Sequence, residues 1–308
     1  MSDADVPTEI EPVDGIEGVD DPDTGHARTT TVRRKMSPFE IFLVVFGVLL
    51  VATAIFGSFL PLPDPTQQSL RERLQPPVGF GGGWDHPLGT DALGRDMLSL
   101  LVAGTRLTVL IAALSVLVGA TVGCGLGLIA GFRRGWVDAV ITRLTEAQMA
   151  LPFLLLAIAI ITNRGRSITT LVIVLSIVGW TQYVRIVRAD TMAIRERPFI
   201  QGLRIGGASD TRIVLRHILP NVAGTIVALA TLEVGTMILA ESALSFLGLG
   251  VVSPDISWGG LLADGRDNLR DAWWVVTLPG LAIVVVVLYV NLAGDALRSR
   301  YDLRKRDH

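Results

Sequence analysis

Two carboxylic acids, Glu233 and Glu241, stand inside a long apolar run. A charged side chain at the centre of a bilayer costs about 2.5–3.5 kcal/mol, so such residues face protein or water rather than lipid. Positions 233 and 241 lie about 80° apart around an ideal helix, so both side chains could border one cavity. Together with Ser242 they either line or gate a transport path, or they are hydrogen-bonded or protonated within a helix bundle.

The residue patterns of common enzymes are missing from the sequence. There is no Gly-x-x-x-x-Gly-Lys-Ser/Thr phosphate-binding loop, and the only lysines, Lys35 and Lys305, stand in other contexts. The 4 histidines are scattered without the spacing of metal ligands, so no metal site is expected. We expect no catalytic residues and no cofactor. Energy for any transport must then come from a partner subunit or from an ion gradient.

The composition is that of an integral membrane protein. Apolar residues make up 50% of the chain, and about 20 of them in succession can cross a bilayer as a helix. The pattern predicts an all-α, polytopic membrane protein with six transmembrane helices. The predicted spans are residues 41–60, 107–132, 137–162, 168–187, 222–247 and 273–293.

Small and aromatic residues add detail to these spans. Close approach of helices in lipid depends on small residues, and the second span carries a series of glycines that suit contact within the chain or with another subunit. The tryptophans near the ends of spans fit an interfacial aromatic belt. These residues are Gly119, Gly123, Gly125, Gly127, Gly131, Trp258, Trp273 and Trp274.

The net charge of −2 conceals an acidic N-terminus, because residues 1–26 hold nine Asp or Glu and no Lys or Arg. Such a segment is predicted to be disordered. The expected organisation is a disordered acidic cytoplasmic tail (1–35), a first transmembrane helix with an extracytoplasmic loop (36–106), a core of five transmembrane helices (107–297) containing a cytoplasmic loop (189–220), and a cytoplasmic C-terminal tail (298–308).

Basic residues predict the orientation, since they concentrate on the cytoplasmic side of a membrane. Arg33, Arg34 and Lys35 precede the first span, which puts the N-terminus in the cytoplasm. Six crossings return the C-terminus to the same side. The chain is therefore expected in the plasma membrane of the cell, surrounded by lipid, with both ends inside.

A polar insert between the fourth and fifth spans, residues 195–220, differs from its surroundings. Pro198 can begin a helix, Gly206 and Gly207 can end it, and Ser209 or Asp210 can cap the next. Pro220 is expected to stop that second helix. Two short helices with a Gly-Gly turn would form an exposed elbow suited to contact with a soluble partner.

The insert resembles the cytoplasmic loop of ABC importer permeases, in which Glu-Ala-Ala precedes a glycine and a closing Leu-Pro pair. Gly207, Leu219 and Pro220 match this pattern, whereas Gln201-Gly202-Leu203 replaces Glu-Ala-Ala and His217 replaces an isoleucine. The resemblance implies a type I importer fold and contact with an ATPase. The implied coupling residues are Gln201, Gly202, Arg204, Gly206, Gly207, Asp210, Arg212, Arg216, Leu219 and Pro220.

Further blocks resemble the dipeptide, oligopeptide and nickel group of these permeases, specifically its C-type subunit. They occupy residues 86–96, 245–250, 258–259 and 291–298, and the likeness extends over residues 36–303. Glu241 matches an acid that precedes the second block. The resemblance implies transport of short peptides. The implied partners are a second permease, two ATPase domains and an extracytoplasmic binding protein, with no nucleic acid.

Asp91, Arg95 and Asp96 lie just before the second span, on the side assigned to the exterior. Asp91 and Arg95 are spaced to pair if that stretch is helical. These three residues either face the binding protein or form a local clasp.

Two other functions stay open. A permease of the same group could carry nickel or another small solute instead of peptides. An ion-coupled secondary transporter could use Glu233 or Glu241 as a proton carrier, although such folds often show internal repeats, which are not evident in this sequence.

Overall fold

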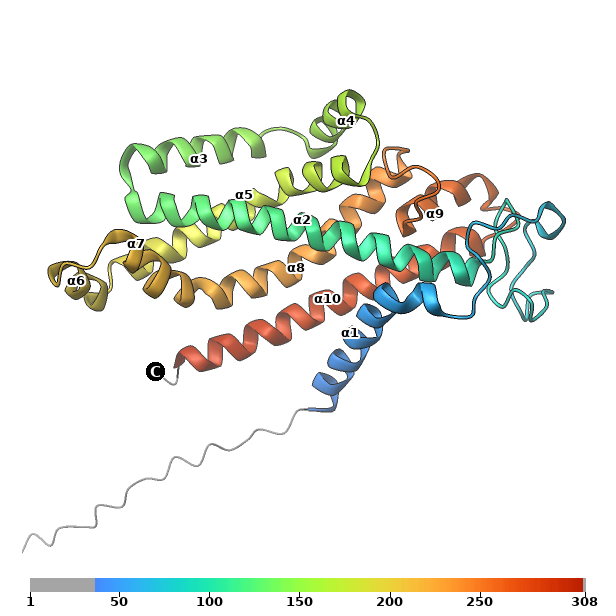
Figure 1. Ribbon diagram of the computed structural model, residues 1–308, viewed down its shortest axis with the longest axis horizontal. Helices are drawn as coiled ribbons and strands as arrows, with labels where there is room; N and C mark the ends of the chain where they lie inside the picture. The colour runs from blue at the N-terminus through green and yellow to red at the C-terminus, as the bar shows by residue number, and fades with distance from the viewer. Residues whose placement is uncertain (1–36, 307–308) are drawn as a thin grey trace, which may run out of the picture. The chain divides into compact units, whose positions relative to one another are not determined.

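The computed structural model describes residues 37–306, with side chains as far as residue 299; the expected acidic tail, residues 1–35, lies outside this range. The described chain folds into helices (Figure 1). The long ones are α1 (Pro38–Phe56), α2 (Met97–Arg133), α5 (Ile168–Arg195), α8 (Leu219–Phe246) and α10 (Trp274–Arg306). The shorter ones are α3 (Gly135–Met149), α4 (Phe153–Arg164), α6 (Pro198–Ile205), α7 (Asp210–Ile213) and α9 (Trp258–Gly265).

Five helices of the described chain are long and apolar enough to cross a membrane, or six crossings if α3 and α4 count as one. The third span predicted over 137–162 is a bent pair of helices, because α3 and α4 meet at 88°. Pro152 causes the break, since proline lacks an amide donor and disfavours helical geometry in the residue before it. The Gln148 side chain supports the break by donating to the Ile177 carbonyl and accepting from the Trp180 indole.

Several helices extend beyond the predicted spans. Helix α2 begins at Met97, where the Asp96 carboxylate accepts a hydrogen bond from the Ser99 amide at 2.8 Å. Helix α5 continues to Arg195, and α10 continues through Arg306, into the expected C-terminal tail. Hydropathy reports how much of a helix is apolar, whereas capping residues decide where it begins and ends.

Glycines bring α2 and α5 together. A Cβ atom added at Gly123 would lie 2.4 Å from the Trp180 carbonyl, and one at Gly131 would lie 2.7 Å from the Arg188 carbonyl. A Cβ atom at Gly127 would lie 2.9 Å from the Val184 carbonyl, one at Gly119 would lie 3.4 Å from the Ser176 carbonyl, and one at Gly125 would meet nothing within 4 Å. The small-residue face thus serves contact within the chain, as expected of backbones that pack closely in lipid. Only Gly125 lies off this face.

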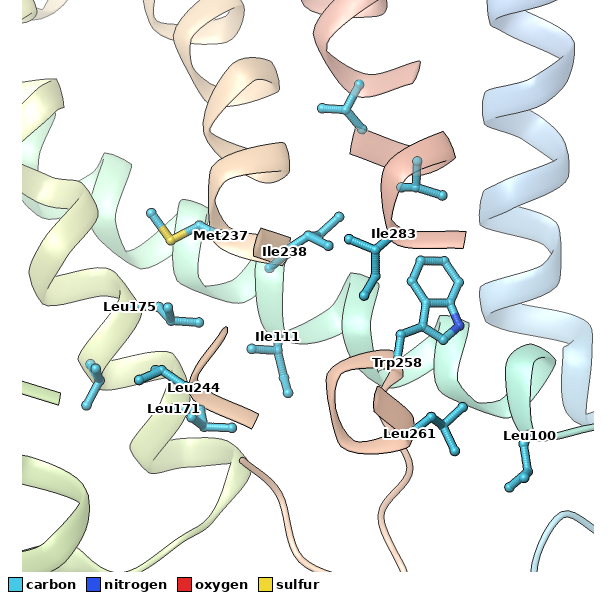
Figure 2. Close-up of a cluster of buried hydrophobic side chains, with 14 of the residues drawn as sticks. Leu100, Ile111, Leu171, Leu175, Met237, Ile238, Leu244, Trp258, Leu261 and Ile283 are labelled. Atoms are coloured by element: carbon cyan, nitrogen blue, oxygen red, sulfur yellow. The ribbon is translucent and has the colours of Figure 1, made fainter. Parts of the chain in front are cut away.

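The described chain has two main apolar clusters, at opposite ends of the long helices. One packs side chains of α2, α5, α8, α9 and α10, and Figure 2 shows Trp258 and Leu261 of α9 among them. The other surrounds Phe132 and includes Ile200 of α6 and Ile213 of α7. In Figure 1 the short helices α6 and α7 lie at one end of the long helices, called here the elbow end. Helix α9 and the 60–96 loop lie at the other, the loop end.

Helix α1 is attached loosely by comparison. Leu43 is its one buried residue in the structure. The Phe46 ring packs on the Tyr289 ring of α10 at 4.7 Å between centroids. Most of its apolar surface is exposed, as suits a helix that faces lipid or another subunit.

Candidate functional site: the elbow and the loop end

The elbow, defined here as residues 198–213, begins and turns as the sequence predicts. Pro198 occupies the first turn of α6, and Gly206 ends that helix. Gly207 has a φ of 78°, a conformation that favours glycine over residues with a side chain. The amide of Ala208 closes the turn by donating to the Leu203 carbonyl at 3.0 Å.

The predicted stop at Pro220 is wrong. A π-helical stretch, Val214–Ile218, joins α7 directly to α8, whose first turn contains Pro220. Proline is tolerated in a first turn because the amide it lacks has no partner there in an ordinary helix. The Asn221 side chain donates to the His217 carbonyl at 2.7 Å beside it. Asp210–Phe246 is therefore one continuous helix of 37 residues, long and apolar enough to cross a membrane, that starts within the elbow.

The coupling residues expected from the sequence gather on the exposed surface of this region. All of them are exposed except Leu219, which is half-buried. Three large apolar residues of the same surface were not expected there from the sequence: Phe199, Ile205 and Leu215 are also exposed, Ile205 to 89%. Their positions alternate with the inward-facing Ile200 and Ile213, and that register was the available signal.

Phe132, at the end of α2, anchors the elbow. The guanidinium of Arg204, on α6, lies 5.0 Å from the centre of its ring, and that of Arg195, at the end of α5, lies 5.6 Å away. Cations at such distances are attracted to an aromatic ring. Arg134 also pairs with Glu196 at 3.1 Å. The elbow thus contacts the ends of both α2 and α5.

Glu241 is fully buried near the loop end of α8. Its Oε1 atom accepts hydrogen bonds from the Ser245 hydroxyl at 2.7 Å and the Ser257 hydroxyl at 2.9 Å. Ser242 and Glu233 are also buried, the latter nearer the elbow end of α8. The hydrogen-bonded alternative weighed from the sequence therefore describes Glu241 in this chain, while a role of the three residues in a path stays a prediction.

The polar residues before α2 are held in a clasp. The Asp91 carboxylate accepts hydrogen bonds from the amides of Leu93 and Arg95 and from Arg95 Nε, the last at 2.6 Å. The pairing is as expected, but the stretch is a turn rather than a helix, since Gly94 adopts a φ of 72°. Asp96 caps α2 and lies 3.1 Å from His86 Nδ1. Both aspartates are buried, so a partner protein would contact the residues beside them rather than their carboxylates.

Two tryptophans expected at a membrane interface are buried instead. The Trp258 indole donates to the Leu101 carbonyl at 2.9 Å, and that of Trp274 donates to the Thr90 carbonyl at 3.0 Å. Trp273 is exposed, as expected, and packs edge-on against Phe80 at 5.1 Å. An indole can be buried when its N–H has an acceptor, and backbone carbonyls of the 60–96 loop and α2 provide one.

A cavity of about 730 Å³ opens at the loop end, between α1, α2 and the segment before α9. Its lining includes the apolar Leu107 and Ile256 and the charged Arg106, Asp64 and Asp255. Hydrogen bonds from the Thr66 hydroxyl and amide lower the pKa of the Asp64 carboxyl. The cavity thus offers charges of both signs beside an apolar wall.

Residues 123–307 match the family described as binding-protein-dependent transport system inner membrane component. The chain belongs to this family. The di/tripeptide transport system permease protein DppC of Pseudomonas aeruginosa (strain UCBPP-PA14) is 42% identical over 84% of this chain and 86% of its own. The glutathione transport system permease protein GsiD of Pectobacterium atrosepticum is 36% identical over 84% of each.

A solved structure supports the same fold for this permease. The MetNI methionine ABC transporter, in an inward-facing conformation, aligns with a TM-score of 0.56 over 67% of this chain and 97% of that one, at 20% identity. The permease is thus an inner membrane component of an ABC importer with the expected all-α fold. Subunits of this family are distinct from the ATPase, in keeping with a sequence that holds no phosphate-binding loop.

Proposed function

We propose that this permease forms half of a path for dipeptides and short oligopeptides and takes its energy from separate ATPase subunits at the elbow. One observation carries the proposal: a continuous helix, Asp210–Phe246, begins inside the exposed elbow and ends at the loop end. A partner that moves the elbow therefore moves a helix that crosses the membrane. A second, similar permease would supply the other half of the path.

We place the elbow and both chain ends in the cytoplasm. The elbow end carries many arginines, among them Arg133, Arg134, Arg195, Arg204 and Arg212, which suits the cytoplasmic side of a membrane. The end of α10 points toward the same side as α6 (Figure 1). The loop end then faces the exterior, where a binding protein would deliver substrate.

The ATPase contact would combine apolar and polar groups. Exposed Phe199, Ile205 and Leu215 suit a hydrophobic groove on the partner, and the exposed arginines around them suit its polar rim. When two ATPase domains close on ATP, the elbow would move as one piece, because Phe132 and the apolar cluster around it hold it together. The helices would then alternate between inward-open and outward-open states.

Peptides are the preferred substrate class for two reasons. Relatives that are 42% and 36% identical to this chain over the aligned residues are named for di/tripeptide and glutathione transport. The 730 Å³ cavity at the loop end offers Arg106 to a carboxylate and Asp64 or Asp255 to an amino group, as a short zwitterionic peptide requires. Glu233, Glu241 and Ser242 remain candidates for the path itself.

The binding protein would dock on the exposed part of the loop end. Asp91, Arg95 and Asp96 would act there by holding the 60–96 loop in shape, because the aspartates are buried. The exposed rings of Phe59, Phe80 and Trp84 would provide the contact surface. Aromatic side chains are enriched at such interfaces.

The test is Ile205→Asp, with Thr211→Asp as the matched control on the exposed surface of α7. A charge at Ile205 should lower both co-purification of the ATPase and ATP-dependent uptake of a labelled dipeptide more than about tenfold. Thr211→Asp should change each less than about twofold. Equal uptake by Ile205→Asp and wild type would refute docking at the elbow.

The substrate and the energy source are tested by uptake into lipid vesicles that contain the complete transporter. Uptake of labelled nickel without dipeptide uptake would replace the peptide assignment by that of a metal importer. Dipeptide uptake driven by a proton gradient in the absence of ATP would instead favour an ion-coupled transporter.

A further inference from the structure

The Glu241 carboxyl group lies at the contact between α8 and α9. Of its two hydroxyl donors, Ser245 belongs to α8 itself, whereas Ser257 immediately precedes α9. Only the second hydrogen bond therefore connects the two helices. All three side chains are buried, so water does not compete readily for the bond.

Ser257 also determines where α9 starts. Its hydroxyl oxygen accepts a hydrogen bond from the Gly260 amide at 3.1 Å while the same hydroxyl donates to Glu241. Next to it, the Gly259 backbone is pressed against α8: an added Cβ atom would lie 2.6 Å from the Ser242 Cα atom. Helix α9 is thus held on α8 both by a hydrogen bond and by close backbone packing.

Helix α9 is bound to the rest of the loop end as well. The Trp258 amide donates to the Thr108 hydroxyl of α2 at 3.1 Å, and a Cβ atom on Gly265 would lie 2.9 Å from the Val275 side chain of α10. Arg95, fixed by Asp91, lies 3.5 Å from Asp264 of α9. A displacement of the 60–96 loop would therefore displace α9.

We propose that Glu241 is a positioning residue for coupling, which through Ser257 transmits the position of α9 and the 60–96 loop to α8 and so to the elbow. The inference rests on the proposed function, because it gives the exterior surface a physical connection to the ATPase contact. Glu241 acts as a hydrogen-bond acceptor in this role. It need not touch the substrate.

Two serine variants separate this role from simple stability. Ser257→Ala and Ser245→Ala each remove one hydroxyl from Glu241 Oε1, but only Ser257→Ala breaks the link to α9. In the complete transporter, isolated through a tag on this chain and placed in lipid vesicles, we expect Ser257→Ala to lower dialanine uptake per ATP hydrolysed. The expected loss is about fivefold to tenfold, as for one strong hydrogen bond, with basal ATPase activity unchanged.

Further variants address the cap at Ser257. Ser257→Thr keeps the hydroxyl and should restore coupling, and Glu241→Gln keeps an acceptor oxygen and should retain most of it. Gly259→Ala keeps every hydrogen-bonding group but forces α9 away from α8, so it should reproduce the defect. Loss of coupling in Ser245→Ala as large as in Ser257→Ala, or full coupling in Gly259→Ala, would overturn the proposal.

Hydrogen exchange gives a readout that does not depend on transport. In Ser257→Ala the amides of α9 should exchange faster than in wild type, while in Ser245→Ala they should not. Unchanged exchange in Ser257→Ala would overturn the link itself. Absence of ATP-dependent dipeptide uptake in wild type would refute the proposed function and leave the exchange result to judge the link.

Discussion

The two ends of this permease are held together by different kinds of contact. At the loop end, buried side chains make directional hydrogen bonds across elements: Trp258 to α2, Trp274 to the 60–96 loop, and Glu241 to Ser257. At the elbow end, apolar side chains pack around Phe132, two arginines contact its ring, and the ion pair between Arg134 and Glu196 is exposed. The first arrangement fixes one geometry, while the second allows adjustment.

This difference suits the proposed roles of the two ends. Buried hydrogen bonds are costly to break without replacement, so the loop end should keep its form during transport. Apolar contacts and cation–π contacts have weaker angular requirements, so the packing of α6 on the ends of α2 and α5 can adjust while α7 stays continuous with α8. Removal of a buried ring at the loop end should therefore mainly affect folding, and distortion of the elbow should mainly affect coupling.

The largest effect is expected from Trp258→Ala at the loop end. It removes a buried ring and the hydrogen bond to the Leu101 carbonyl, and truncation of such a ring costs about 3–5 kcal/mol. Thermal unfolding of the purified protein in detergent measures the loss. The control is Trp84→Ala, a residue 82% exposed, which should leave the unfolding temperature unchanged.

A smaller effect on folding, but loss of uptake, is expected from Gly207→Leu at the elbow. A Cβ atom at Gly207 meets nothing within 4 Å, so the cost is backbone strain at a φ of 78°, of about 1–2 kcal/mol. The turn would change shape, and ATP-driven dipeptide uptake should be lost with membrane insertion intact. Gly202→Ala, in a helix with free space around it, serves as control. Normal uptake by Gly207→Leu would contradict the difference between the two ends.

The smallest effect is expected from Arg134→Gln, which removes the exposed ion pair with Glu196. Exposed pairs contribute about 0–1 kcal/mol, and less at high salt. The free energy of unfolding should change by no more than about 1 kcal/mol at physiological salt. The rate of ATP-driven dipeptide uptake should stay within about twofold of wild type. A strong defect would mean that the elbow depends on directional polar contacts after all, and the comparison of the two ends would fail.

Much of the fold could be predicted from the sequence, because the apolar spans and the glycines of α2 report directly on burial in lipid. The span over 137–162 was predicted without the 88° bend between α3 and α4, since hydropathy averages over a bend. The continuity of α7 with α8 was also missed. Pro220 favours a helix end on local grounds, whereas here it lies in the first turn of α8, directly after a π-helical stretch.

The elbow was predicted well, since proline and glycine act on the backbone at their own positions. The partners of Glu241 were not predicted, because Ser257 belongs to another helix and only tertiary packing brings it near. The same holds for Trp258 and Trp274. Their hydrogen-bond acceptors are backbone carbonyls, which every residue carries, so the sequence does not indicate which one is used. Local backbone features could thus be predicted from the sequence, whereas contacts between distant segments could not.

The glycine face of α2 has a consequence for biogenesis. Its partner is α5, not the helix that follows it in the chain, and a ribosome delivers α3 and α4 before α5 emerges. Helix α2 can pack against α1 and α3 first, but its glycine face must wait in lipid for α5, which its uncharged stretch over 107–132 permits. The contact between α2 and α5 then forms only once more than half of the polypeptide has been synthesised.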